Sequence, residues 1–110
     1  MPEELVWKEE FRVRAIEITP EPERYLEPAE EWMIPETSEP FIVLEADEGL
    51  HEIYLEELGK LDVELARARI TRTEDGRIRI IPEKPLTCKV EYWVDYKNRK
   101  SWKNIYCRLR

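Results

Sequence analysis

The side chains that could carry out chemistry are few and lie far apart in the sequence. The chain has one histidine, His51, and two serines, Ser38 and Ser101, which fall in segments that we expect to be loops. Nucleophilic catalysis needs a nucleophile, a base and an orienting group in contact, and this spacing does not point to such a set. The three glycines are expected at turns, which leaves no glycine-rich phosphate loop.

Acidic side chains are abundant, which makes them poor evidence for a catalytic pair. With 25 Asp and Glu residues, carboxylates meet by chance, and the sequence fixes no separation between any two of them. The strand pairing expected below sets Glu45 opposite His51, and we interpret this as a surface pair rather than a weak metal or acid/base site. Zinc is not expected, because there is no second cysteine pair. We predict a protein that is not an enzyme, with no metal, cofactor or small-molecule substrate.

Two cysteines, Cys88 and Cys107, are the remaining reactive groups. If they lie opposite each other on neighbouring strands, they are compatible with a cross-strand disulfide, which demands a specific geometry. An ordinary cytosol would keep them reduced, whereas intracellular proteins of hyperthermophiles often carry disulfides. The sequence leaves both states open.

Cations and aromatic rings are interspersed through residues 89–110, which contain seven basic side chains and two acidic ones. Exposed aromatics among cations suit protein interfaces and also stack on nucleic-acid bases. The candidate contact surface consists of Trp93, Trp102, Tyr106, Lys89, Lys100 and Arg108. We expect either this surface to meet a partner or a second layer of the protein to cover its rings.

Residues 86–109 must position these groups, and they are predicted to form one long β-hairpin. Both arms alternate apolar and polar residues with a period of two, which is typical of strands. Folding about residues 97 and 98 gives four cross-strand pairs: Cys88 with Cys107, Val90 with Ile105, Trp93 with Trp102, and Asp95 with Lys100. The hairpin therefore has a cysteine side and an aromatic side.

Residues 19–40 form a Pro/Glu-rich segment that is predicted to be irregular. Five prolines within it exclude a long helix or a central strand. Its apolar trio Trp32, Met33 and Ile34 follows Glu30 and Glu31, and we treat these residues as an acidic arm. The arm either packs on its own sheet or reaches a neighbouring molecule, where its charge would complement the basic hairpin.

The other predicted strands are 5–18, 41–46, 50–56, 61–73 and 77–82. In 5–18 the apolar residues change side after Ala15, which indicates a bulge or a strand that serves two layers. Residues 41–46 and 50–56 are expected to form a hairpin with a three-residue loop ending at Gly49, which sets Val43 opposite Ile53. The rival interpretation is a helix over 50–58. A further hairpin sets Ile70 opposite Ile80.

About seven strands and no long helix predict an all-β fold, either an antiparallel β-sandwich or a partly open barrel. We expect a single β domain over residues 1–110, because 42% hydrophobic residues suffice for a core in a chain of this length. With no long apolar run and no signal-peptide pattern, we predict a soluble protein of the cytoplasm or a virion, without membrane contact. The abundance of Glu and scarcity of amides indicate either a thermostable natural protein, from a thermophile or one of its viruses, or a de novo designed one without biological function.

Charge divides the chain into two halves. Residues 1–64 have a net charge of −15 and residues 65–110 a net charge of +8. The halves could neutralise each other within one fold, associate head to tail between copies, or bind a polyanion. Our leading hypothesis is a non-catalytic protein-binding or assembly module, such as a structural subunit, that uses the aromatic side of the 86–109 hairpin; the alternative is a nucleic-acid-binding domain using the same hairpin.

Overall fold

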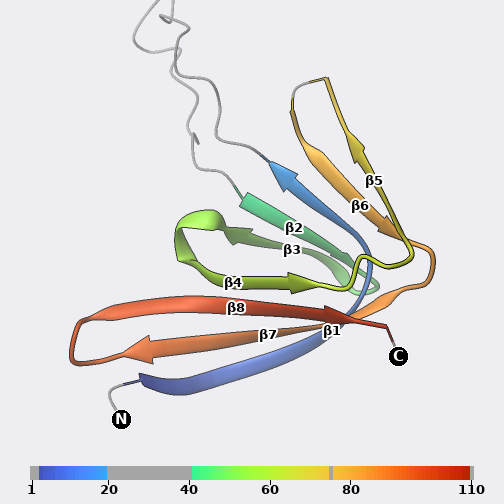
Figure 1. Ribbon diagram of the computed structural model, residues 1–110. Helices are drawn as coiled ribbons and strands as arrows, with labels where there is room; N and C mark the ends of the chain where they lie inside the picture. The colour runs from blue at the N-terminus through green and yellow to red at the C-terminus, as the bar shows by residue number, and fades with distance from the viewer. Residues whose placement is uncertain (1–2, 20–40, 75, 110) are drawn as a thin grey trace, which may run out of the picture.

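The computed structural model describes residues 3–19, 41–74 and 76–109 (Figure 1). Within them, eight strands and one 3-10 helix follow in the order β1 (Glu3–Thr19), β2 (Phe41–Ala46), β3 (Gly49–Tyr54), η2 (Leu55–Glu57), β4 (Leu58–Val63), β5 (Ala68–Arg72), β6 (Ile78–Pro82), β7 (Leu86–Asp95) and β8 (Lys100–Arg108). The all-β prediction is confirmed, and of the two expected architectures the structure has the partly open barrel: one mixed sheet curls into half of a barrel.

Strand order explains the curl. The main path of the sheet is β3-β2-β1-β7-β8-β4, and β6 pairs with both β1 and β5. Strands β3 and β4 lie at the two ends of this path, yet the three residues of η2 join them. So short a connection requires the two ends of the sheet to approach each other. The sheet is therefore held in a curve by its own chain.

Strand β1 runs through the whole sheet, and its two halves have different neighbours. Its first half, from Glu3, pairs with β7. From Val13 onward β1 pairs with β2 on one edge, and Ile16 to Ile18 pair with β6 on the other. The predicted change of side coincides with a bulge between Val13 and Ala15, after which Ala15 and Ile16 are both buried.

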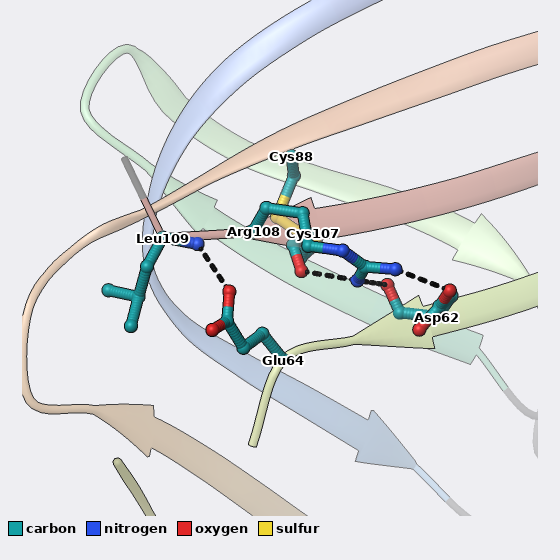
Figure 2. Close-up of a disulfide and its surroundings, with 6 residues drawn as sticks. All are labelled: Asp62, Glu64, Cys88, Cys107, Arg108 and Leu109. Carbon is teal, nitrogen blue, oxygen red and sulfur yellow. Dashed lines mark hydrogen bonds and ion pairs between the residues drawn. A yellow bond between two sulfur atoms is a disulfide. The ribbon is translucent and has the colours of Figure 1, made fainter. Parts of the chain in front are cut away.

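The β7–β8 hairpin has the register that its alternation predicts, including all four expected pairs. Cys88 and Cys107 form a disulfide with their Cα atoms 4.0 Å apart (Figure 2). At the turn, Asp95 accepts hydrogen bonds from the backbone N–H and the side-chain amide of Asn98 at 3.2 and 2.8 Å. Arg99 completes the turn in a left-handed conformation, with a φ of 53°.

The β2–β3 hairpin forms as expected, but its predicted register is wrong by one residue. Ala46 pairs with Gly49 across a two-residue loop, so Ile42 rather than Val43 lies opposite Ile53. Alternation could not fix this register, because the consecutive residues Ile42, Val43 and Leu44 are all buried. The register therefore depends on the loop, where a two-residue connection replaces the predicted three-residue one. The rival helix over 50–58 is absent, and only η2 is helical there.

The predicted strand over 61–73 is two strands. β4 ends at Val63 and β5 begins at Ala68, with a turn between them where the apolar pattern changes side near Leu65. β5 then pairs with β6 as predicted, with Ile70 opposite Ile80. β4 lies parallel to β8, which departs from the fully antiparallel prediction. Local alternation carries no information on such a long-range pairing, because the two strands are far apart in sequence.

The core is a single cluster inside the curve of the sheet, and the disulfide belongs to it. Its members come from β1, β2, β3, β6, β7 and β8: Val13, Ile16, Ile42, Leu44, Ala46, Ile53, Ile80, Leu86, Cys88, Val90, Ile105 and Cys107. Consequently the cysteine side of the β7–β8 hairpin faces inward, and its aromatic side faces outward.

Candidate binding surface

Three apolar side chains form a row across the outer side of the sheet. The strand registers set Leu5 beside Trp93, and Trp93 beside Trp102. The two indole rings stack with their planes 5° apart and their centroids 6.4 Å apart. Leu5 is 41% exposed, and both tryptophans are partly exposed. The row brings β1, β7 and β8 together at one apolar strip, which we call the tryptophan row.

Gly59 on β4 leaves room for the Trp102 indole, so the tryptophan row ends against the backbone of β4. A Cβ atom placed on Gly59 would lie 2.4 Å from Cδ1 of Trp102 and 2.6 Å from Oδ1 of Asn104. The indole thus occupies the space that a side chain at position 59 would need. This is why Trp102 is half-buried although it points outward.

Coverage of the aromatic side comes from sheet neighbours. Among the described elements, β7 has its main contacts with β1 and β8, and β8 has its main contacts with β7, β4 and η2. Within that part of the chain, the predicted second layer over the rings is not seen. The rings are neither fully covered nor fully exposed, so a flat partner surface could contact their outer edges.

Lys89 and Tyr106 lie beyond the tryptophan row on the same side. The Lys89 ammonium lies 5.3 Å from the centre of the Tyr106 ring, in a cation–π contact. The same ammonium lies 3.6 Å from the Glu91 carboxylate. Glu91 also accepts a hydrogen bond from the indole N–H of Trp93 at 3.2 Å. One carboxylate therefore orders both a cation and a tryptophan of the candidate surface.

Arg108 joins β8 to β4 at the far end of this side (Figure 2). Its guanidinium donates hydrogen bonds to the Asp62 carboxylate at 2.5 Å and to the carbonyl of Cys107 at 3.0 Å. The hydrogen bond with Arg108 lowers the pKa of Asp62 and raises the pKa of Arg108, so the pair stays charged. Figure 2 also shows the backbone N–H of Leu109 donating to the Glu64 carboxylate, at 2.8 Å.

Lys100 lies at the turn end of the surface, opposite Asp95, and is exposed. The hydrogen bond from the Asn98 side chain lowers the pKa of Asp95. Two of the three predicted cations, Lys89 and Arg108, thus have an acidic partner on the surface itself. This pairing leaves little unbalanced positive charge for a phosphate backbone.

The structure adds three residues that sequence reasoning missed: Leu5, Gly59 and Asp62. They come from β1 and β4, whose pairing with the hairpin is long-range, so no local pattern connects them to it. A glycine inside a strand is the one available signal, since it often marks a close approach of other atoms. The predicted acidic arm, Glu30, Glu31, Trp32, Met33 and Ile34, lies outside the described residues.

His51 does not face Glu45, so that expected pair is wrong. The shifted β2–β3 register sets His51 opposite Leu44. Its ring stacks on Phe11 with a centroid distance of 3.8 Å, and its Nε2 lies 3.3 Å from a carboxylate oxygen of Glu48.

Glu45 serves a structural role instead. It accepts two hydrogen bonds from the Arg79 guanidinium, at 3.0 and 3.4 Å, which raise the pKa of Arg79. This contact ties β2 to β6 across β1. Throughout the described residues, no group of three or more metal-ligating side chains comes together.

A hollow of about 520 Å³ opens beside the turn end of the surface. Tyr54 and the acidic pair Glu56 and Glu57 line one wall, and residues 99–102 line the other. Lys103 bridges the walls nearby with an ion pair to Glu57 at 2.8 Å. Since the hollow is open and lined by both signs of charge, it resembles an extension of a protein-binding surface more than an enclosed ligand pocket.

The chain matches no family model, no curated protein and no solved structure in the comparisons made with each. In the described residues, no helix has the length and apolar character that crossing a membrane requires.

Proposed function

We propose that this protein is a non-catalytic protein-binding or assembly module, and that its contact surface is the outer side of the β7–β8 hairpin. The tryptophan row is the observation that carries the proposal: two stacked indoles continue into an exposed leucine across three strands. Tryptophan dominates many protein interfaces, because it buries a large rigid surface at low entropic cost.

Charge on this side favours a protein partner over a nucleic acid. Lys89 and Arg108 form ion pairs with acidic side chains, which reduces their attraction for phosphate. Such a mixture of charges suits the polar rim of a protein interface. The neighbouring hollow, lined by Tyr54 and carboxylates, extends the surface in the same mixed character. An acidic wall would repel a nucleic acid.

Light scattering across a range of protein concentrations tests this proposal. We expect the wild-type protein to form concentration-dependent oligomers that Trp93→Ala and Trp102→Ala weaken, while circular dichroism verifies that each variant is folded. Tyr96→Ala is the matched control, since Tyr96 is a 66% exposed aromatic in the turn, outside the row. Monomers throughout, in the wild type and in every variant, would contradict the proposal.

A further inference from the structure

Among the described strands, β3, β4, β5 and the first half of β1 each have one edge that pairs with no other strand, and the edges of β1 and β5 carry opposite charge. β1 pairs only with β7 along Glu3 to Phe11, so its other edge is open there. β5 pairs only with β6, so its outer edge is open as well. Each open edge offers unpaired backbone N–H and C=O groups, which can accept a further strand.

The edge of β1 is acidic with exposed apolar side chains. Residues 3–10 hold four glutamates and one lysine. Between them, Leu5, Val6 and Trp7 are 41%, 52% and 58% exposed. Three consecutive exposed apolar residues are unusual on a free strand edge, because they promote pairing with another chain.

The edge of β5 is basic and also exposes an apolar side chain. Arg67, Arg69 and Arg72 are exposed, and residues 67–72 hold no acidic residue. Ile70 among them is 55% exposed. The two edges therefore combine opposite charge with apolar groups on both sides, which is the pattern of a complementary interface.

A single molecule cannot bring its own β1 edge and β5 edge into contact. Figure 1 shows β5 at the upper right of the sheet and the first half of β1 along its lower border. β1 and β5 are not in substantial contact within the described residues, where β6 separates them. Contact between the edges thus requires two copies, and a head-to-tail contact repeats with each added copy to give a ring or a filament.

We propose that copies of this chain associate head to tail by strand addition, with β5 of one copy pairing along the free edge of β1 of the next. The proposal rests on the assembly role proposed above and names its partner as a second copy, but it uses the backbone edge of β1, which shares only Leu5 with the tryptophan row. Charge complementarity identifies this occupant: pairing two β1 edges would oppose glutamates, and pairing two β5 edges would oppose arginines.

Charge reversal on one edge at a time tests the proposal. Glu3→Lys/Glu4→Lys makes the β1 edge basic, and Arg69→Glu/Arg72→Glu makes the β5 edge acidic; the described residues give none of these four side chains an ion pair. By light scattering at low salt, each variant alone should associate about tenfold more weakly than the wild type, or not at all, because attraction becomes repulsion. Added salt should also weaken wild-type association, because it screens the attraction between the acidic and the basic edge.

An equimolar mixture of the two variants is the decisive sample. In it, the basic β1 edge of one variant meets the acidic β5 edge of the other, and the two unaltered edges are also complementary, so oligomers should return. Lys84→Glu/Lys97→Glu is the control for the β5 variant, because it makes the same change in net charge at exposed positions off both edges. This control should associate like the wild type.

Other outcomes separate this inference from the proposed function. If both edge variants assemble like the wild type, or the mixture stays monomeric, edge pairing between copies is overturned. If Trp93→Ala abolishes association while the edge variants do not, the tryptophan row is supported and the edge interface is not. The reverse result supports the edge interface alone.

Discussion

The two halves of β1 have the same secondary structure and opposite surroundings. From Val13 to Thr19, β1 has neighbours on both edges, and Val13 and Ile16 are fully buried. From Glu3 to Glu10, it has a neighbour on one edge and its side chains are mostly exposed. The closed half supplies stability by burying apolar surface, whereas the open half keeps surface available for contact. One continuous strand thus connects the core to the candidate interfaces.

Truncating one side chain in each half of β1 tests whether the closed half contributes more to stability than the open half. Ile16→Ala should lower the free energy of unfolding by about 2 to 5 kcal/mol, because it leaves a cavity in the closed half. Val6→Ala, at an exposed position of the open half, should change it by less than about 0.5 kcal/mol. Urea denaturation monitored by circular dichroism measures both values. Similar costs at the two positions would show that the halves do not differ in stability.

Reducing the disulfide should have the next largest effect. The bridge joins positions 19 residues apart and lies in the core opposite Phe11, near the point where the two halves of β1 meet. Its loss should lower the free energy of unfolding by about 3 kcal/mol, because the unfolded chain gains freedom. Urea denaturation with and without a reductant measures this difference.

A variant without the bridge serves as its control. Cys88→Ala/Cys107→Ala should unfold at the same urea concentration with and without reductant. Hydrogen exchange on the reduced wild type should lose protection at β7 and at the open half of β1 before it does at β2. Uniform loss of protection would mean that the two halves unfold as one unit.

Adding a methyl group under the tryptophan row should have a smaller effect. Gly59→Ala places a Cβ within 2.4 Å of the Trp102 indole, so the ring must move. We expect a loss of about 1 to 3 kcal/mol in stability and a change in tryptophan fluorescence. Lys60→Ala, at the exposed neighbouring position, should leave both unchanged. Unaltered fluorescence in Gly59→Ala would show that the indole does not rest on β4.

Acid should weaken the turn end of the open half by the smallest amount. The hydrogen bonds from Asn98 lower the pKa of Asp95 below its ordinary 3.8. A carboxylate with a lowered folded-state pKa adds stability above its unfolded pKa and loses it as pH falls through the folded one. Stability should therefore fall below about pH 4, less steeply in Asp95→Asn. Urea midpoints between pH 2 and 6 measure this, and equal slopes would contradict it.

Local pattern in the sequence was sufficient for the register of two of the three described hairpins, β5–β6 and β7–β8. The Cys88–Cys107 and Ile70–Ile80 pairings followed from alternation and turn position alone. The β2–β3 register did not, because consecutive buried residues there remove the alternation that fixes a face. The candidate surface was only partly predictable for a related reason: Trp93 and Trp102 are on the hairpin, while Leu5 and Gly59 arrive by long-range pairing.

The parallel pairing of β4 with β8 also determines when the sheet can form during translation. β4 leaves the ribosome well before β8, which supplies its hydrogen-bonding partner in the sheet. The first half of β1 likewise waits for β7. During translation, the nascent chain can form the β2–β3 hairpin early, but the curve of the sheet can close only after β8 has been synthesised. This sheet is therefore expected to form only once β8 is available, at the slow rates of non-local β topologies.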